Sequence, residues 1–504
     1  MTDGQRLSQY VAIDLGAGSG RALVGAVSAA RIDLTEVHRF RYEPRHQAGH
    51  LRWDGTALFE GLSAGLRNAQ TVSASRGGAI TSIGVDSWGV DYGLLDSAGR
   101  LLQDPISYRD HRTERVPAEV FARIPRAELF ARTGIQFLQL NTLYQLYAHV
   151  RAGLPEETAH LLLIPDLCHH FLCGAISCER TNASTTQLLG AHTGEWDDGL
   201  FEALELPRAI MPPLIDAGCT LGLLTSQRRQ AIGLRDGEIR IVAPATHDTG
   251  SAVLGTPLDD GWAFVSSGTW SLIGVERPQP LLAPAVAEAN FTNERGAFGT
   301  VRFLKNVMGL WLLESCRKEW ALAGYHEDVP TLLKRVAALP GFAGFVFPDD
   351  TRFFNPVSMT RELRAALTDT GQASTFDPVV LTKVILDSLA LRYTAILDTM
   401  EQLTDASIPG LHIVGGGCLN DYLNQATANA ARRPVLAGPV EATASGNIIV
   451  QAIADGTLDS IAHARRLMRD TIKPRRFEPR DEPAWREATR RYREIEPHQP
   501  PQPH

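Results

Sequence analysis

A segment near the start of the chain combines glycines with an acid and a hydroxyl. It is Asp14–Arg21, Asp-Leu-Gly-Ala-Gly-Ser-Gly-Arg, and it ends a β-forming run that starts at Tyr10. Glycines let backbone N–H groups approach phosphate oxygens, and the serine hydroxyl adds a donor. The Asp14 carboxylate could hold Mg²⁺ through water beside such a phosphate cradle. A tight glycine turn that binds no ligand is the alternative interpretation.

The residues after this turn do not fit either of two common kinds of phosphate-binding loop. A dinucleotide-binding fingerprint needs a helix after its glycines. Here residues 21–27, Arg-Ala-Leu-Val-Gly-Ala-Val, indicate a strand, and the Gly-Lys-Ser/Thr ending of a Walker loop is missing. The sequence therefore predicts a hairpin. A second strand, turn and strand, with Ser266–Ser271 at its turn, comes half a chain length later. Two such turns predict a nucleotide clasped between two halves.

An acid also follows a strand-like run at the end of the first half. Thr246-His-Asp-Thr-Gly-Ser251 comes after the run 239–243 and before the helix-like residues 252–254. A carboxylate at this strand end, Asp248, could take a proton from an attacking hydroxyl. An aspartate that only caps the helix is the competing interpretation.

Glycine-rich segments in the second half have two interpretations each. Ile413–Asn420 holds three consecutive glycines between a strand and a helix. They would let a flat base lie against the backbone, or they make a tight turn only. Residues Ala437–Gly446 are rich in Gly and Ala and predict the start of another helix. Small residues there allow close approach of a ligand or of another helix.

A structural zinc site is disfavoured. Cys168, Cys173 and Cys178 lie near His169 and His170, but their spacing places the cysteines on different helix faces. The chain also has no C-x-x-C pair.

Composition places the chain among ordinary globular proteins. Of its 504 residues 44% are hydrophobic and 21% are charged, and the net charge of −8 argues against a nucleic-acid binder with a basic surface. Six cysteines exclude a disulfide scaffold. Without an apolar leader or a run of about 18 apolar residues, we expect a cytoplasmic protein with no membrane partner, as a monomer or a homodimer.

Strands that alternate with helices predict an α/β fold. Helical periodicity is clearest over 380–400 and 447–454. We expect two domains, 8–256 and 261–475, with a linker at Pro257–Gly261. Residues 476–504 are charged and then Pro-rich, and we expect this tail to be partly disordered.

Together these segments resemble the FGGY family of carbohydrate kinases over about residues 10 to 480. The motifs that carry the resemblance are Asp14–Arg21, Gly84–Asp91, Tyr108–Asp110, Thr181–Gln187, His247–Thr249, Ser266–Leu272, Leu304–Leu313 and His412–Cys418. The resemblance implies an α/β fold of two actin-like (ribonuclease H-like) ATPase domains with a central cleft. It also implies phosphoryl transfer from ATP, with Mg²⁺, to the 1-hydroxyl of the ketose L-rhamnulose.

The resemblance further assigns residues to the two substrates. The ATP phosphates would lie on Ala17, Gly18, Ser19, Gly20 and Arg21, with Thr269 on the other side, Gly416 beside the adenosine and Glu314 near ATP. The sugar would contact Gly89, His247, Asp248, Thr249 and Asn306, and Asp248 would accept the proton. This chain departs from the family pattern twice. Glu314 stands where the family usually has Gln, and Asn293–Gly296 lacks one of the two glycines that usually follow its Glu.

Three other functions stay open on the sequence. The first is a kinase for another ketose, such as L-fuculose or a pentulose, against which only the neighbourhoods of Trp88–Gly89 and Asn306 argue. The second is an actin-like ATP-binding sensor or assembly module, for which the His247–Asp248 pair has no obvious use. The third is an α/β domain that binds no nucleotide.

Overall fold

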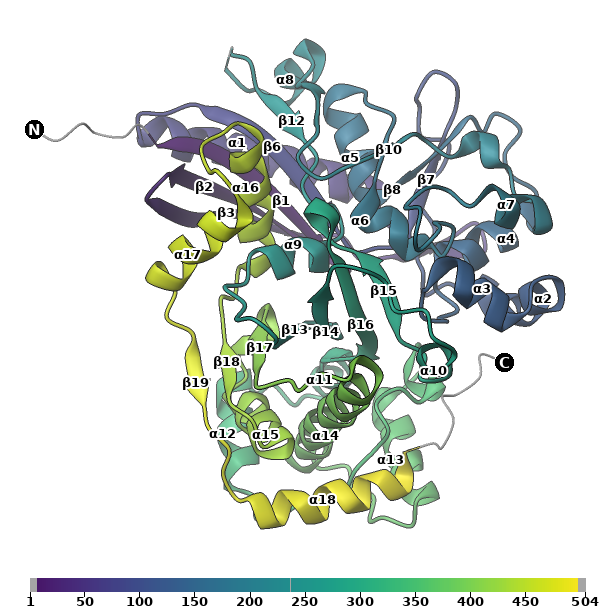
Figure 1. Ribbon diagram of the computed structural model, residues 1–504, viewed down its shortest axis with the longest axis vertical. Coiled ribbons are helices and arrows are strands. Elements are labelled where there is room, and N and C mark those ends of the chain that lie inside the picture. Colours follow the sequence, from purple (N-terminus) through teal and green to yellow (C-terminus); the bar gives the residue numbers. More distant parts are fainter. Residues whose placement is uncertain (1–6, 236, 497–504) are drawn as a thin grey trace, which may run out of the picture.

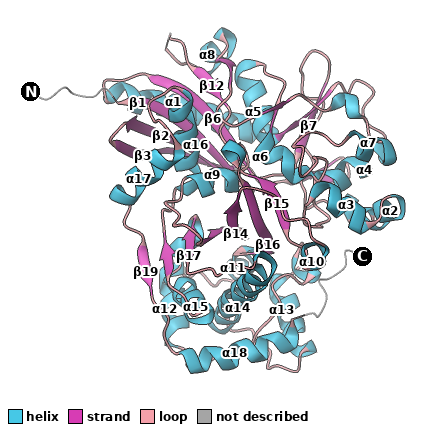
Figure 2. Ribbon diagram, viewed as in Figure 1, coloured by secondary structure: helices cyan, strands magenta, loops and turns pink. Residues whose placement is uncertain are grey.

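The computed structural model describes residues 7–235 and 237–496 as two main sheets surrounded by helices (Figure 1, Figure 2). Within these residues the first sheet has six strands in the order β11-β12-β6-β1-β2-β3. Their bounds are β1 Ser8–Gly16, β2 Ser19–Ser28, β3 Arg31–Arg41, β6 Ile80–Ser87, β11 Thr220–Leu223 and β12 Arg240–Val242. The second has seven, in the order β15-β16-β14-β13-β17-β18-β19. Their bounds are β13 Ala263–Ser267, β14 Trp270–Arg277, β15 Thr292–Arg295, β16 Val301–Met308, β17 Leu411–Val414, β18 Val435–Ala437 and β19 Arg475–Phe477.

The two sheets repeat one arrangement. β1 pairs antiparallel with β2 and parallel with β6, and β13 pairs antiparallel with β14 and parallel with β17. Each sheet therefore contains a hairpin with a parallel strand on its other side. The predicted α/β fold is confirmed, and so are both predicted hairpins, because a strand follows the glycines in each.

Helices cover both faces of the first sheet because β1 is apolar on both. Side chains alternate across a strand. Val11 and Ile13 pack with α1 (Gly55–Ser75), whereas Tyr10 and Ala12 pack with α16 (Ala442–Ala454) and α17 (Ile461–Thr471). In sequence, α16 and α17 lie within the range predicted for the second domain. In space they lie against the first sheet, whose second apolar face they bury (Figure 1).

The helix α9 (Asp248–Leu254) crosses α16 at backbone distance. A Cβ on Gly446 would lie 1.8 Å from Ser251 O, and a Cβ on Gly255 would lie 1.9 Å from Ala442 O. Only glycine fits at such a crossing. At Gly446, the small residues of the 437–446 segment therefore serve the close approach of two helices.

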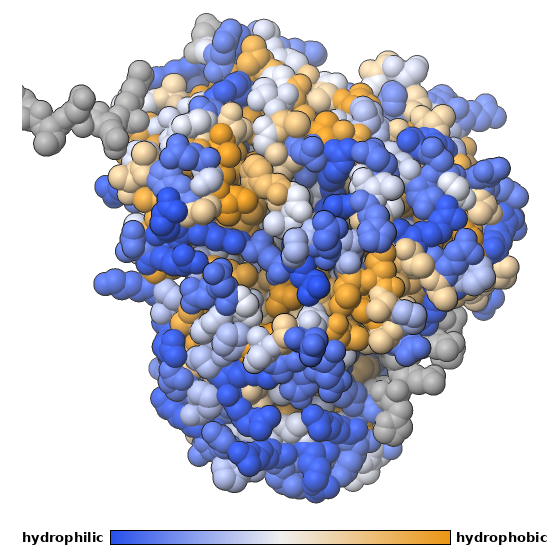
Figure 3. Space-filling view, in the orientation of Figure 1, coloured by the Kyte–Doolittle hydropathy of each residue, from blue (hydrophilic) through white to orange (hydrophobic). Residues whose placement is uncertain are grey.

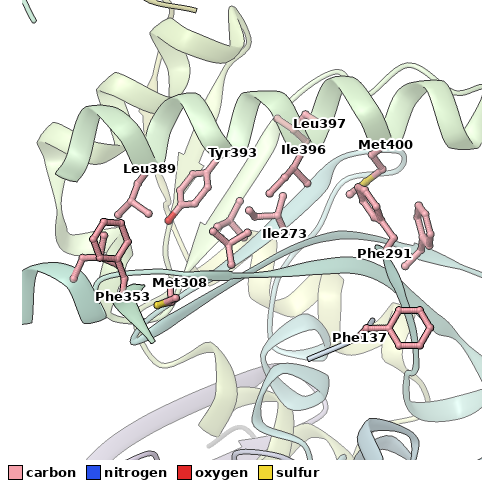
Figure 4. Packing of buried hydrophobic residues seen from close by; sticks show 14 of the residues in the cluster. Phe137, Ile273, Phe291, Met308, Phe353, Leu389, Tyr393, Ile396, Leu397 and Met400 are labelled. Atoms are coloured by element: carbon pink, nitrogen blue, oxygen red, sulfur yellow. The ribbon is translucent and has the colours of Figure 1, made fainter. Parts of the chain in front are cut away.

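The second sheet packs on a long buried helix, α14 (Pro378–Thr404). The Asp377 side chain accepts hydrogen bonds from Val379 N and Val380 N, and Pro378 fits the first turn. The predicted helix over 380–400 is confirmed. Figure 4 shows one face of α14 turned toward the strands that carry Ile273 and Met308, with the side chains of Leu389, Tyr393, Ile396, Leu397 and Met400.

The segment predicted as a partly disordered tail contains a helix, α18 (Glu482–Ile495). Its Trp485, Ala488 and Tyr492 are buried, and the Trp485 ring meets the Phe342 ring edge-on at a centroid distance of 4.9 Å. The helix forms because these three apolar residues recur at helical spacing among many charges, and partial disorder of the tail stays a prediction. Residues 497–504 lie outside the described part of the chain.

The surface in Figure 3 is mostly hydrophilic over the lower part of the molecule, and apolar side chains gather between the upper and lower parts. Within residues 7–235 and 237–496, no helix is both long enough and apolar enough to cross a membrane. All six cysteines are free thiols.

Replacing Trp485 with alanine removes an aromatic ring from the contact between α18 and Phe342. We expect Trp485→Ala to lower the free energy of unfolding by about 3 kcal/mol, as large core truncations do, and thus to lower the thermal midpoint in calorimetry. Arg486→Ala, on an exposed position of the same helix, is the matched control and should leave the midpoint nearly unchanged. Equal midpoints for the two variants would contradict a stabilising role of the buried face of α18.

Candidate active site

The turn of the first hairpin is held from behind by a buried tyrosine. Gly16 and Ser19 pair across the turn, and Gly18 has φ 121°, which other residues rarely adopt. The Tyr42 hydroxyl donates to Gly16 O at 2.6 Å and is 3.2 Å from Ser19 O. Tyr42 therefore fixes both ends of the turn.

The second hairpin has an equivalent turn at Gly268 and Thr269. Thr269 O accepts hydrogen bonds from Gly309 N at 3.1 Å and Trp311 N at 3.2 Å, which tie the turn to α11 (Trp311–Leu322). The three glycines after β17 pack on this hairpin, since a Cβ on Gly417 would lie 2.0 Å from Ser267 Oγ. The glycine segment and the second turn thus form one surface.

A cavity of about 290 Å³ lies between the two turns. The start of α9 and the glycines after β17 complete its walls. Its lining includes Asp14, Ala17, Arg21, Gly89, His247, Asp248, Thr249, Thr269, Asn306 and Gly416. A neighbouring cavity of about 400 Å³ shares Gln136, Trp270 and Asn306 with it. The combined volume is in the range of small-molecule sites.

Acidic side chains come together at the ends of strands in the first sheet. Asp14 forms an ion pair with Arg21. Asp86, on β6, is fully buried; it accepts a hydrogen bond from Asn447, and its Oδ1 has no donor among the described residues. Burial and the nearby charges of Asp14 and Asp248 raise the pKa of Asp86. Within the described residues, no cluster of three or more His, Cys, Asp or Glu side chains could hold a metal ion.

Asp248 is the first residue of α9 and lines the cavity. Its side chain is 29% exposed. Its Oδ1 accepts a hydrogen bond from Thr249 N at 2.5 Å and lies 3.5 Å from His247 Nε2. Burial raises the pKa of Asp248, His247 opposes this shift, and Asp14 adds to it. A partly accessible carboxylate with a raised pKa is suited to accept a proton. The N-cap position is occupied by His247, which weakens the competing interpretation of Asp248 as a cap.

Glu294, on β15, connects two predicted sugar-binding residues. Its Oε2 lies 3.3 Å from His247 Nδ1, and its Oε1 accepts a hydrogen bond from Asn306 Nδ2 at 3.3 Å. The Arg302 guanidinium, on β16, lies 3.1 Å from the same carboxylate. Gln136 Oε1 accepts hydrogen bonds from Asn306 N at 2.9 Å and Asn306 Nδ2 at 3.2 Å. One polar network therefore forms this wall of the cavity.

Comparison with protein families assigns both halves of the chain to the same family. The profile described as "FGGY family of carbohydrate kinases, N-terminal domain" matches residues 9–255, and the profile of the C-terminal domain matches residues 263–454. The chain belongs to the FGGY family of carbohydrate kinases. The resemblance predicted from the motifs is confirmed, and the chain is a carbohydrate kinase.

Named relatives of the chain support its assignment to this family. The chain is 42% identical over 494 residues to a rhamnulokinase of Pectobacterium carotovorum subsp. carotovorum (strain PC1), with 97% of each chain covered. It is 38% identical over 473 residues to the rhamnulokinase of Bacillus subtilis (strain 168), covering 94% of this chain and 96% of the relative.

Solved structures of a xylulose kinase and a glycerol kinase share the fold. A xylulose kinase of Lactobacillus acidophilus superposes with a TM-score of 0.78 at 15% identity, and a Plasmodium falciparum glycerol kinase with a TM-score of 0.76 at 16% identity, each over 97% of both chains. The predicted pair of actin-like (ribonuclease H-like) domains is thereby confirmed.

Most of the residues that the family resemblance assigned to substrates lie together in the cavity described above. Gly18, Ser19 and Gly20 belong to the same turn as Ala17 but do not line the cavity. Glu314 lies exposed on α11 and lines neither cavity. Its place near ATP stays a prediction.

Sequence reasoning missed Tyr42, Gln136 and Arg302, which hold other site residues in place. No local signal marks them, because each reaches a site residue across a long stretch of chain. Glu294 lies in the Asn293–Gly296 segment, which the sequence marked only as lacking one glycine. An acid in a segment that departs from the family pattern was the one available signal.

Removing the Tyr42 hydroxyl leaves two turn carbonyls without their donor. We expect Tyr42→Phe to raise the KM for ATP about three- to tenfold, the loss of one hydrogen bond, and to leave the KM for the sugar nearly unchanged. An ADP-release assay measures both. Tyr10→Phe removes a hydroxyl that donates to Asp455 and Thr457, away from the cavity, and should change neither KM. A selective rise in the sugar KM would contradict the assignment of this turn to the nucleotide.

Proposed function

We propose that this protein phosphorylates the 1-hydroxyl of L-rhamnulose with ATP and yields L-rhamnulose 1-phosphate and ADP, a step in L-rhamnose catabolism. Relatives that match almost the whole chain are named rhamnulokinase, and that name supplies the sugar. The observation that carries the chemistry is the cavity that places the Asp248 carboxylate between two glycine turns. Phosphoryl transfer to an alcohol needs such a base on the acceptor side and donors around the phosphate.

The proposal places ATP across the two turns. The backbone of Ala17–Arg21 binds the phosphates from one side, Thr269 binds them from the other, and Glu314 lies toward the nucleotide. Gly416 lies beside the adenosine. A Cβ on Gly416 would meet nothing within 4 Å, so this glycine leaves room for a flat base against the backbone.

The acidic side chains of the cavity suit a divalent cation held through water. Asp14 and Asp248 line the cavity, and behind them Asp86 keeps an oxygen that no donor in the described part of the chain reaches. Carboxylate and phosphate oxygens are the ligands that Mg²⁺ prefers. Asp14 would contact the ion through water, with the ATP phosphates as its direct ligands. The ion supplies positive charge to the phosphoryl group in transfer.

Asp248 acts as the general base in this proposal. The sugar oxygen forms a bond to the γ-phosphorus while the bond between that phosphorus and the β–γ bridging oxygen breaks, and the hydroxyl proton passes to the Asp248 carboxylate. Gly89, His247, Thr249 and Asn306 hold the sugar so that this hydroxyl faces the phosphorus. Because the site lies between two halves, their approach excludes water and limits ATP hydrolysis.

The domain bounds, the compartment and the oligomeric state are part of the same proposal. We assign domains 8–256 and 261–475 to the two halves. All six cysteines are free thiols, as expected in the reducing cytoplasm. Both turns, the base and the sugar-binding residues come from one chain, so the site works equally in a monomer and in a homodimer.

A panel of ketoses with ATP and Mg²⁺ tests the substrate. We expect kcat/KM for ADP release to be highest with L-rhamnulose, by about tenfold or more over L-fuculose and pentuloses, and mass spectrometry to find the sugar monophosphate. A higher kcat/KM for one of the other ketoses would reassign the substrate. ATP hydrolysis at a rate that no sugar changes would instead favour a sensor or assembly module.

Asp248→Asn keeps the shape of the side chain and removes the proton acceptor. We expect kcat to fall about 10²–10⁴-fold, with the sugar KM changed little. Asp198→Asn is the matched control, because Asp198 is the first residue of another helix, α7 (Asp198–Ala203), and is exposed. A near-normal kcat of Asp248→Asn would contradict the assignment of Asp248 as the general base.

The pH profile provides a second readout of the same variant. The base works only when it is deprotonated, so kcat/KM of the wild-type protein rises as the pH rises through the pKa of Asp248. Since burial raises that pKa, the rise lies above the ordinary aspartate range. Asp248→Asn should lack it.

A further inference from the structure

His247 has a different partner at each ring nitrogen. On one side Nδ1 lies 3.1 Å from Arg302 Nη2 and 3.3 Å from Glu294 Oε2. On the other side Nε2 lies 3.5 Å from Asp248 Oδ1. The neutral imidazole has one N–H and one lone pair, so its partners decide which nitrogen donates. That choice determines what the ring presents to the sugar.

The Arg302 contact decides the position of the proton. A guanidinium can only donate hydrogen bonds. Of the two groups at Nδ1, Arg302 is the nearer, and its approach has the geometry of a hydrogen bond. Nδ1 must therefore offer a lone pair, and the proton of the neutral ring lies on Nε2.

Arg302 is fixed in the orientation that this role needs. Its side chain is 1% exposed. Nε and Nη2 donate to Arg295 O at 3.1 and 2.9 Å, and Nη2 is 3.4 Å from Thr181 O. Glu294, 3.1 Å from Nη1, balances the buried positive charge, which would be costly alone. The guanidinium therefore cannot turn away from the ring.

The backbone of His247 is fixed as well. Thr181 Oγ1 accepts a hydrogen bond from His247 N at 3.2 Å. The buried Glu179 carboxylate accepts hydrogen bonds from Thr246 N at 2.9 Å and Thr246 Oγ1 at 3.0 Å. The loop and the ring are thus held independently, the loop by residues of the first half and the ring by strands of the second sheet.

We propose that Arg302 and Glu294 are positioning residues that hold His247 in the Nε2–H tautomer, with this donor directed into the cavity beside Asp248. The N–H then binds a sugar oxygen adjacent to the hydroxyl whose proton Asp248 accepts. Glu294 fixes Arg302, which sets this donor, and also accepts a hydrogen bond from Asn306, so that one carboxylate orients sugar contacts from both halves. The inference rests on the proposed function for the identity of the sugar, whereas the tautomer is a property of the free protein.

The tautomer is measured without any substrate. Protein labelled with ¹⁵N-histidine gives a long-range ¹H–¹⁵N correlation pattern for each ring, and the signals that vanish in His247→Gln belong to His247. At pH 8 we expect the pattern of a neutral ring with its proton on Nε2. A proton on Nδ1, or a doubly protonated ring, would overturn the proposal.

A paired variant tests the role of the two positioning residues. Glu294→Gln/Arg302→Met removes both buried charges together, which avoids leaving one of them unpaired. We expect a mixture of tautomers and a sugar KM raised about tenfold, with the KM for ATP unchanged. Glu276→Gln/Arg465→Met removes another partly buried ion pair, 2.6 Å long and outside the cavity lining. It should leave the tautomer and the sugar KM as in the wild type.

The readouts separate this inference from the proposed function. An unchanged tautomer with an unchanged sugar KM in the paired variant would overturn the positioning role. Should calorimetry show that the paired variant is unfolded, Glu294→Gln alone is measured in the same way, because it keeps the hydrogen bond to Asn306. A wild-type protein that phosphorylates no ketose would overturn the proposed function, and the spectrum would still decide the tautomer.

Discussion

The crossing of α9 and α16 is the contact on which the geometry of the site depends. At Gly255 and Gly446 the two helices touch through their backbones, and a side chain on either glycine would meet a carbonyl oxygen of the other helix at less than 2 Å. α9 begins at Asp248, and α16 carries Thr443, which lines the same cavity. Because backbones in contact cannot move closer, this crossing fixes the base relative to the segment that enters from the second half.

The acidic cluster next to this crossing opposes folding stability. Burial and mutual repulsion raise the pKa values of Asp86 and Asp248. A carboxyl with a raised pKa holds its proton to higher pH in the folded chain than in the unfolded chain. The folded state therefore loses stability as the pH rises from the ordinary aspartate range through the raised values. The fold tolerates this loss because Arg21 and Asn447 contact Asp14 and Asp86.

The sequence predicted what local chemistry determines. The two hairpins, the strand end at Asp248 and the helix over 380–400 follow from glycines, alternation and helical periodicity within short windows. Contacts between distant segments could not be predicted from such windows. Arg302 meets His247 and Tyr42 meets Gly16 only after the sheets have formed. The buried face of α18 likewise depends on distant residues, since Phe342 lies opposite Trp485 and Phe345 opposite Tyr492. The position of α16 on the first sheet also depends on such a contact, since in sequence α16 lies between β18 and β19 of the second sheet.

The repeated hairpins differ in charge, and this difference explains their separate roles. Aligning Gly16 with Gly268 places Asp14 of the first hairpin opposite Ser266 of the second. The acidic residues Asp14, Asp86 and Asp248 all lie on or directly after elements of the first half, whereas the second turn offers hydroxyl groups and backbone N–H groups. A triphosphate with acids on both sides would be repelled from both. Because the second turn, Ser266–Ser271, carries no acid, a cation and a proton acceptor have their place beside the first turn, and the neutral second turn can bind the phosphates from the other side.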